Sequence, residues 1–193
     1  MLGALTICGL SGGEARAHPH LWIDAAATVL FEKDRIVGIR FQWIFDEFFS
    51  AGVIGEFDKN KNKTFDAEEI EPLRVGAFEG TKEVGFFTDI IMNDTEKFEI
   101  QTTTDFAARI EKGVVMYDFT VPFPAPIDPT KLTFSVYDMS YFVDIGFQGH
   151  EPIKLSGDGS ENCAASVTED RLNPIYGGIV YPKKVQLQCP KPR

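Results

Sequence analysis

The chain has 193 residues and a formal net charge of −10, and its residues are 44% hydrophobic and 25% charged. These proportions are typical of a globular protein, and the length suffices for one domain with a sizeable core. The acidic balance, without a run of Lys or Arg, argues against nucleic acid as a partner and favours cations over anions as ligands. The high content of Phe, 17 residues, indicates a β-rich core.

The first seventeen residues have features of a secretion signal. An apolar stretch covers Leu2–Leu10, and Ala15-Arg16-Ala17 is an A-x-A cleavage pattern. A basic segment before the apolar stretch is missing, so we expect the start codon to lie upstream. No other stretch approaches the ~18 apolar residues of a membrane span. We therefore expect an exported protein, with a signal over residues 1–17 and a mature chain over residues 18–193.

Two histidines follow the predicted cleavage site. Cleavage would give His18 a free α-amine, and His20 lies on the same side of an extended chain. The amine and two imidazoles are three nitrogens suited to copper, nickel or zinc. Pro19 prevents the usual amino-terminal copper chelate, which needs a deprotonated amide at the second position. His150, in a Gly-rich loop, could join this site if the fold brings the segments together; otherwise these histidines are an exposed terminus and a loop residue.

Two strands are predicted next. Residues alternate loosely over Leu21–Glu32 and more regularly over Ile36–Phe45, with a polar turn at Lys33-Asp34-Arg35. Strands joined by so short a turn should pair antiparallel.

The spacing of oxygen donors after these strands is that of an EF-hand calcium loop. Side-chain oxygens occupy loop positions 1, 3, 5, 9 and 12, and a backbone carbonyl occupies position 7. The donors are Asp58, Asn60, Asn62, Asp66 and Glu69, with the carbonyl of Thr64.

The flanks of this loop read as helices. Asp46–Phe57 places apolar residues four apart on one face. We interpret Asp46 and Glu47 as an acidic first turn favoured by the helix dipole, and the alternative is that they are metal ligands. Asp66 followed by Glu69 predicts a capping box for the second helix. Pro72 should bend that helix. We therefore expect a helix-loop-helix insertion at about residues 46–80.

Two features predict weak calcium binding. Position 6, which favours Gly, is Lys63, so this residue must accept a positive φ at a cost of roughly 1 kcal/mol. Lys59, Lys61 and Lys63 also offset the carboxylates of the loop. The expected dissociation constant is about 0.1–1 mM or weaker. The alternative is a helix connector that keeps the loop shape without the ion.

Strand patterns resume after the insertion and continue to the C-terminus. With one helical pair and no alternation of strands and helices, this order predicts a mainly β fold, an antiparallel β-sandwich-like domain that carries the EF-hand-like insertion. The predicted strands are Gly85–Met92, Lys97–Thr104, Phe106–Glu111, Val114–Phe123, Leu132–Phe147, short strands from Ile153, and Val185–Cys189. A Pro-rich stretch over residues 122–129 is expected to be a stiff extended link.

Cysteine usage agrees with export. Without Cys8, the mature chain has Cys163 and Cys189, which can form one disulfide in an oxidising compartment. A bridge closing a loop of about 27 residues would stabilise the fold by roughly 3 kcal/mol. The alternative is two free thiols. No C-x-x-C is present, which argues against redox catalysis or a thiolate zinc site.

Several short segments together resemble one bacterial family. It consists of periplasmic proteins of unknown function, often labelled ABC-type transport periplasmic components and encoded beside NicO-type nickel/cobalt permeases. This chain has Met139 where the family has Pro, and Lys63 where the loop has Gly. The segments are Ala17–Trp22, Phe45–Glu47, the EF-hand-like loop after Glu56-Phe57, Phe86-Phe87 and Val136–Phe142.

The resemblance implies a periplasmic protein of a Gram-negative bacterium that handles nickel, cobalt or zinc with a membrane metal permease. It implies His18 and His20 as the ligands. Asp138, beside Tyr141, is a second choice, because a carboxylate could complete a His-rich site. The alternative for Asp138 is a buried or turn-forming acid.

Three functions follow from these patterns. The first is a non-enzymatic, divalent-metal-binding accessory protein of a transport system with a weak calcium site. The second is a calcium-responsive interaction module without a transition-metal role. An enzyme is the least favoured, because the predicted mature chain, residues 18–193, has no G-x-S-x-G, H-E-x-x-H or P-loop motif.

Overall fold

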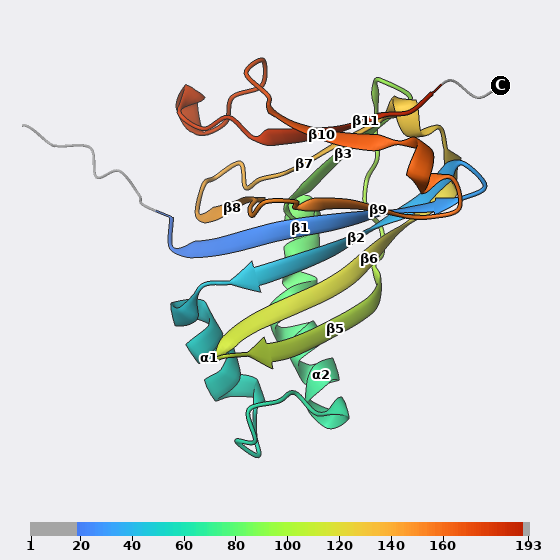
Figure 1. The fold of residues 1–193 in the computed structure, drawn as a ribbon. Coiled ribbons are helices and arrows are strands. Elements are labelled where there is room, and N and C mark those ends of the chain that lie inside the picture. The colour runs from blue at the N-terminus through green and yellow to red at the C-terminus, as the bar shows by residue number, and fades with distance from the viewer. Residues whose placement is uncertain (1–18, 191–193) are drawn as a thin grey trace, which may run out of the picture.

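The computed structural model describes residues 19–190, which form two β-sheets and a helical run (Figure 1). Sheet A has the strand order β5-β6-β2-β1-β8, and β9 also pairs with β1. Its strands are β1 Leu21–Glu32, β2 Arg35–Phe45, β5 Thr104–Glu111, β6 Val114–Ile127, β8 Val143–Phe147 and β9 Ile153–Gly157. Sheet B has the order β10-β11-β7-β3-β4. Its strands are β3 Thr88–Met92, β4 Glu96–Lys97, β7 Leu132–Val136, β10 Ala164–Glu169 and β11 Lys183–Gln188.

The helical run lies between β2 and β3 in the chain. It contains α1 Glu47–Phe57, α2 Ala67–Leu73, a π-helical turn Arg74–Phe78 and a 3₁₀ stretch Glu79–Phe87. Short 3₁₀ turns follow at Pro129–Lys131, Ser160–Asn162 and Tyr176–Gly178. The run lies beside sheet B and covers the lower part of sheet A in Figure 1.

One aromatic core joins these layers. Phe41 of β2 meets Phe134 of β7 edge to face at 6.1 Å, so the inner faces of the two sheets pack on each other. Phe78, from the helical run, lies 5.9 Å from Trp43 and 4.9 Å from Phe119 of sheet A. The predicted β-sandwich-like fold with a helix-loop-helix insertion is therefore confirmed.

The pairing within sheet A is mixed, not purely antiparallel. β1 and β2 pair antiparallel as predicted, whereas β8 and β9 both pair with β1 in parallel. The parallel pairing arises because β7 and β8, expected as one run over Leu132–Phe147, are separate strands in different sheets. The chain leaves sheet B after Val136 and rejoins sheet A at the free edge of β1.

Other predicted strand limits also differ. The strand expected over Gly85–Met92 begins at Thr88, because Gly85, Phe86 and Phe87 take positive φ values of 62°, 53° and 50°. Of the strand expected over Lys97–Thr104, only Lys97 belongs to β4, and Thr104 begins β5. Beyond β4, Phe98 adds one backbone hydrogen bond to β3, from its N–H to the carbonyl of Ile90 at 2.9 Å.

The Pro-rich stretch is part of a strand, not a link. β6 continues through it to Ile127. Its pairing with β5 ends at Thr120, whereas its pairing with β2 reaches Ile127. One edge of this segment is therefore unpaired, which is where a sheet tolerates proline. Among residues 19–190, no helix is long and apolar enough to cross a membrane.

Candidate functional site

The EF-hand-like loop connects the end of α1 to the start of α2 and folds around Asp58. This carboxylate is only 5% exposed. Its two oxygens accept the backbone N–H groups of Asn62 at 3.1 Å and Lys63 at 3.0 Å. The side chain of Asp58, at loop position 1, therefore holds the backbone of Asn62 and Lys63, at positions 5 and 6, close to its own carboxylate.

Position 6 has the backbone conformation that the spacing predicts. Lys63 has a φ of 66°, in the left-handed region that EF-hand loops usually reserve for Gly. Lys61 also has a positive φ, 60°. Lys63 therefore adopts the backbone conformation that Gly usually supplies at position 6, and both lysines are in a conformation that costs free energy.

Glu69, at position 12, closes the loop. It is 8% exposed, its Oε1 accepts the N–H of Lys59 at 2.7 Å, and its Oε2 accepts the N–H of Asp66 at 3.0 Å. The second bond is the carboxylate half of the predicted capping box. One buried side chain thus ties the start of the loop to the first turn of α2.

The remaining donors gather at Asp66. Its Oδ2 accepts the side-chain N–H groups of Asn60 at 2.7 Å and Asn62 at 2.9 Å. The amide oxygen of Asn62 faces the N–H and hydroxyl of Thr64, at 2.8 and 2.7 Å. Both amides would have to turn for their oxygens to reach a cation beside Asp66.

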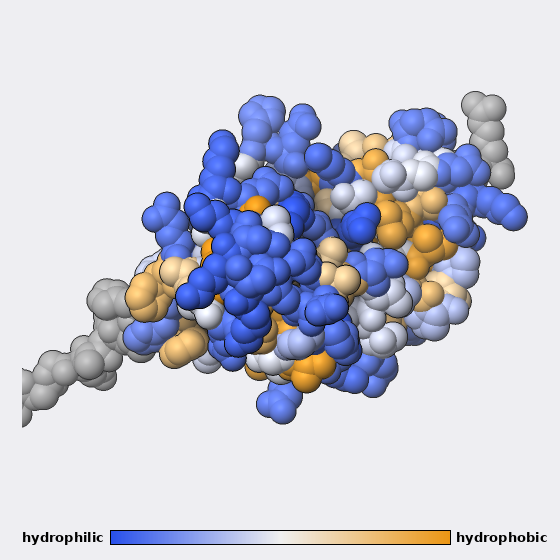
Figure 2. Space-filling model, turned by 90° about the horizontal axis from the view of Figure 1, so that it is seen from below, coloured by the Kyte–Doolittle hydropathy of each residue, from blue (hydrophilic) through white to orange (hydrophobic). Residues whose placement is uncertain are grey.

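The oxygen-bearing residues of this loop are of the types that bind a hard cation, but their side chains are not arranged around one. Within the described part of the chain, none of the three loop lysines forms an ion pair. The hydrogen bonds to the carboxylates of Asp58 and Glu69 come from backbone N–H groups alone. The face in Figure 2 is hydrophilic over much of its area. However, residues 19–190 contain no group of three or more His, Cys, Asp or Glu side chains placed to hold a metal. Coordination by the amide oxygens of Asn60 and Asn62 requires these side chains to turn.

The histidine site is described only in part. His18 lies outside the described residues. His20 is exposed, donates its backbone N–H to the carbonyl of Phe142 at 2.9 Å, and places its ring 4.9 Å from the Phe142 ring. These contacts anchor His20 at the start of β1, beside the start of β8.

The fold does not bring His150 to this position. β1 and β8 run parallel, with Leu21 paired to Val143 and Ala25 to Phe147. His20 lies at the beginning of these strands, whereas His150 follows the end of β8, about 20 Å further along at ~3.3 Å per residue. The side chain of His150 is 98% exposed.

Asp138 organises the turn between β7 and β8. Its carboxylate accepts the N–H and hydroxyl of Ser140 at 2.9 and 2.7 Å, and the N–H groups of Phe142 at 3.1 Å and Val143 at 3.0 Å. Burial alone would raise its pKa, but these hydrogen bonds outweigh burial and lower the pKa. The structure therefore gives Asp138 the turn-forming position that was the alternative to a metal ligand.

Asp46 acts at the helix start, as interpreted from the sequence. Its Oδ1 accepts the N–H of Phe49 at 2.8 Å, which caps α1. Its Oδ2 accepts the N–H of Trp22 at 3.0 Å. This second bond was missed, because no local pattern connects residues 24 positions apart.

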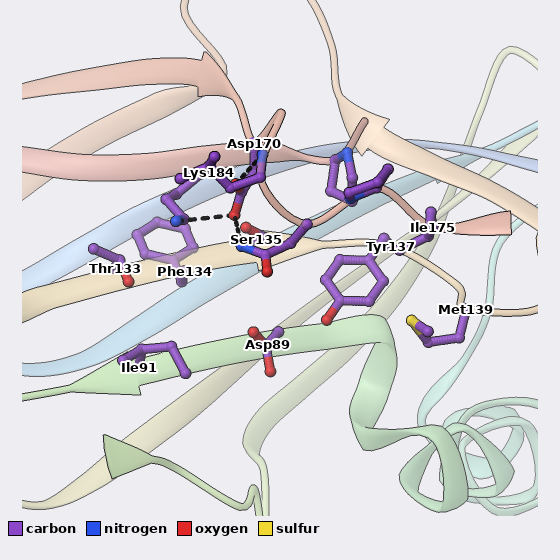
Figure 3. Close-up of a pocket in the computed structure, with 14 residues that line it drawn as sticks. Asp89, Ile91, Thr133, Phe134, Ser135, Tyr137, Met139, Asp170, Ile175 and Lys184 are labelled. Atoms are coloured by element: carbon purple, nitrogen blue, oxygen red, sulfur yellow. Dashed lines mark hydrogen bonds and ion pairs between the residues drawn. The ribbon is translucent and has the colours of Figure 1, made fainter. Parts of the chain in front are cut away.

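The sequence also gave no indication of a cavity on the outer face of sheet B. It has a volume of about 540 Å³, with a floor of β3, β7 and β11 and a roof from the segment before β11 (Figure 3). The lining residues are Asp89, Ile91, Thr133, Phe134, Ser135, Tyr137, Met139, Asp170, Leu172, Asn173, Pro174, Ile175, Pro182 and Lys184. Alternation in β7 predicted which residues share a face, but not which strands lie beside it.

A family model described as "Protein of unknown function (DUF1007)" matches residues 3–186. The chain belongs to the DUF1007 family. An uncharacterized 15.5 kDa protein in the trpE 3′ region of Spirochaeta aurantia is 32% identical to it over 132 residues, which cover 67% of this chain and 93% of that protein. An uncharacterized protein of Haemophilus influenzae is 24% identical over 192 residues, covering 90% and 91% of the two chains. No solved structure matches this chain. Membership of a family of unknown function is thus confirmed, whereas the link to metal permeases stays a prediction.

Proposed function

We propose that this DUF1007 protein is a non-enzymatic protein that binds divalent cations outside the cytoplasm, with calcium in its helix-loop-helix. One observation supports the proposal most: two buried carboxylates, Asp58 and Glu69, close a loop of EF-hand spacing without an ion-pair partner in the described chain. Buried carboxylates without a positive charge are costly, and a bound cation would offset that cost.

The affinity should be weak. The amides of Asn60 and Asn62 must turn before their oxygens can coordinate, and Lys63 holds a positive φ. Three exposed lysines also reduce the negative potential around the loop. We expect a dissociation constant of about 0.1–1 mM or weaker, which suits an extracellular or periplasmic calcium level. The Cys163–Cys189 disulfide supports an oxidising compartment.

Calcium binding is tested by thermal unfolding with and without millimolar calcium. Calcium at about ten times its dissociation constant should stabilise the fold by about 1.4 kcal/mol, or raise Tm by about 3–6 °C at this chain length. Glu69→Gln should abolish this rise. Glu68→Gln, an exposed neighbour with the same change in charge, should keep it. A Tm that does not respond to calcium in the wild-type protein would leave the loop as a helix connector.

Lys63→Gly provides a test in the opposite direction. Glycine removes the strain at a φ of 66°, so the loop should bind calcium more tightly and the calcium-induced rise in Tm should increase. Lys59→Gly is the matched control, because it removes the same charge at a residue without a positive φ. An equal gain from both variants would assign the effect to charge and not to loop conformation.

We also propose a transition-metal site at the mature N-terminus, used by an accessory protein of a nickel, cobalt or zinc transport system with a membrane permease as partner. The observation that favours it is the anchoring of His20 by Phe142, which leaves the imidazole at the point where the chain continues toward His18. His150 and Asp138 do not belong to this proposed ligand set. The remaining alternative is a calcium-responsive interaction module without a transition-metal role.

Calorimetric titration distinguishes these two functions. Protein processed to begin at His18 should bind one of zinc, nickel, cobalt or copper, and an additional N-terminal residue combined with His20→Ala should abolish that binding. His150→Ala should have no effect, because this side chain is about 20 Å away by strand register. Processed protein that binds none of the four metals would favour the interaction module.

A further inference from the structure

The cavity on sheet B has the size of a small-molecule site. Its volume of about 540 Å³ lies within the range of about 300–1,000 Å³ that ligand pockets occupy. A second hollow of about 300 Å³ adjoins it. Asp89, Tyr137 and Met139 line both hollows, so these three side chains lie at their junction.

The floor of the cavity is a row of side chains from three strands. Ser135 of β7 is paired with Asp89 of β3 on one side and with Lys184 of β11 on the other. Thr133 and Tyr137 share the outer face of β7 with Ser135, since side chains two residues apart point the same way. The floor therefore has an acid on one side and a base on the other, and Figure 3 shows both beside the cavity.

The basic side is already neutralised. Nζ of Lys184 lies 2.9 Å from Oδ2 of Asp170, and the same carboxylate accepts the side-chain N–H of Asn173 at 2.9 Å and the N–H of Leu172 at 3.2 Å. These contacts fasten the roof segment to the floor. They leave Lys184 with its charge balanced, so this side offers little attraction to an anion.

The acidic side retains binding capacity. Asp89 contacts Lys97 through Oδ1 at 3.2 Å, and in the part of the chain that the structure describes no residue bonds to Oδ2. The Lys97 side chain is 59% exposed, so this ion pair is worth about 0–1 kcal/mol. An incoming cation can displace Lys97 or use the second oxygen.

Tyr137 adds an aromatic face and a hydroxyl at the same place. Its backbone N–H is bonded to the carbonyl of Phe87 at 2.8 Å, which fixes the position of the residue. Its hydroxyl has no hydrogen-bond partner among residues 19–190. Burial and then the nearby carboxylate of Asp89 raise the pKa of this hydroxyl, so it stays neutral and can donate or accept.

We propose that this cavity binds small organic ammonium compounds with an apolar group. The ammonium lies at the junction, where the carboxylate of Asp89 accepts its N–H groups and the ring of Tyr137 stabilises its charge. The apolar group lies against Met139 and Ile175, which lie on one side of Tyr137 in Figure 3. The net charge of −10 favours cations over anions at this surface. The proposal does not depend on calcium binding by the helix-loop-helix.

Three probes of similar shape test the charge preference: 2-phenylethylammonium, zwitterionic phenylalanine and 3-phenylpropionate. Each is titrated by NMR into the full mature chain, with amide shifts followed at β3 and β7. The ammonium should bind most tightly and 3-phenylpropionate most weakly. Equal or tighter binding of the carboxylate, or no shift at these strands with the ammonium, would overturn the proposal.

Variants then assign the binding to Asp89 and Tyr137. Asp89→Asn should weaken the ammonium by roughly tenfold or more, because a charge-assisted hydrogen bond is lost. Tyr137→Phe removes only the hydroxyl and should have a smaller effect. Asp94→Asn is the matched control, because it changes the same charge in the β3–β4 turn, outside the cavity lining. Unchanged affinity in Asp89→Asn would contradict the proposal.

Lys97→Ala is expected to increase the affinity for the ammonium, a change that misfolding cannot produce. Freed from its ion pair, Asp89 should bind the ammonium up to about fivefold more tightly. An anion site would instead lose affinity when this lysine is removed. Weaker ammonium binding in a Lys97→Ala protein with the Tm of wild type would therefore overturn the proposal even if the other variants failed to fold.

Discussion

Single carboxylates organise the irregular parts of this protein. Asp58 stabilises the EF-hand-like loop, and Asp46 joins the start of α1 to β1. Asp138 stabilises the turn in which the chain passes from β7 of sheet B to β8 of sheet A. Each accepts backbone N–H groups in a turn or near the end of a strand or helix, where the regular hydrogen-bond pattern leaves such groups without partners. An acid that the sequence marks as a candidate ligand can therefore be fully used by the backbone.

Asp138→Asn tests this use of a carboxylate at the residue scale. An amide has one acceptor oxygen where the carboxylate has two, so the substitution should lower the free energy of unfolding by about 1–3 kcal/mol at pH 7. Because the folded-state pKa of Asp138 is lowered, its stabilisation is present above the unfolded-state pKa near 4 and is lost as pH falls through the folded-state pKa. The difference between the two proteins, measured by urea unfolding, should therefore shrink at low pH.

The matched control is Asp24→Asn, on the exposed face of β1. It should change the urea midpoint little at either pH. A difference between wild type and Asp138→Asn that stayed constant from pH 7 to below pH 4 would show that the charge of Asp138 does not stabilise the turn.

At the scale of elements, close backbone contacts decide where strands and helices lie. The hydroxyl of Ser50, fully buried in α1, accepts the N–H of Val115 at 2.9 Å, which fastens the helix to β6. Gly157, at the end of β9, has a φ of 106° and is paired with Phe31 of β1. These contacts position the helical run and the edge of sheet A.

Gly157→Ala should be strongly destabilising. A Cβ at this position would lie 2.0 Å from the carbonyl oxygen of Phe31, and the φ is unfavourable for alanine. We expect a loss of roughly 2–4 kcal/mol in the free energy of unfolding. Gly55→Ala, in α1, is the comparison: no atom lies within 4 Å of its added Cβ, so helix propensity should stabilise it by about 0.5–1 kcal/mol. Urea midpoints that moved in the same direction for both variants would contradict this account.

At the scale of the whole molecule, the predicted disulfide is confirmed and joins the ends of one hairpin. Cys163 and Cys189 have a Cα–Cα distance of 4.3 Å and a separation of 26 residues. The antiparallel register of β10 and β11 pairs Ala164 with Gln188, so Cys163 and Cys189 lie opposite each other one residue beyond this pair. The loop that they close includes the roof of the cavity on sheet B.

Loss of this bridge should destabilise the whole domain. On the chain-entropy model, reduction should lower the free energy of unfolding by roughly 3 kcal/mol, because the unfolded chain gains freedom. The measurement is urea unfolding with and without a reductant. Cys163→Ser combined with Cys189→Ser should match the reduced protein and not respond to the reductant. A stability independent of the bridge would show that the hairpin is held by sheet B alone.

Features that depend on neighbouring residues could be predicted from the amino-acid sequence. The spacing from Asp58 to Glu69 specified the loop and the positive φ of Lys63, because turns and caps join residues a few positions apart. Alternation specified β1 and β2, and an even count of cysteines in the predicted mature chain specified the disulfide. Position 12 of the loop and the acid at the start of α1 were both predicted from local patterns.

Which distant segments meet could not be predicted from local patterns and is seen in the folded chain. The assignment of β7 and β8 to different sheets, the distance of His150 from His20, and the full use of Asp138 by its turn depend on long-range packing and register. The cavity on sheet B requires three strands and a roof segment, which no periodicity relates to one another. The physical reason is that alternation shows which face of a strand is buried, whereas its neighbours are decided by the packing of the whole chain.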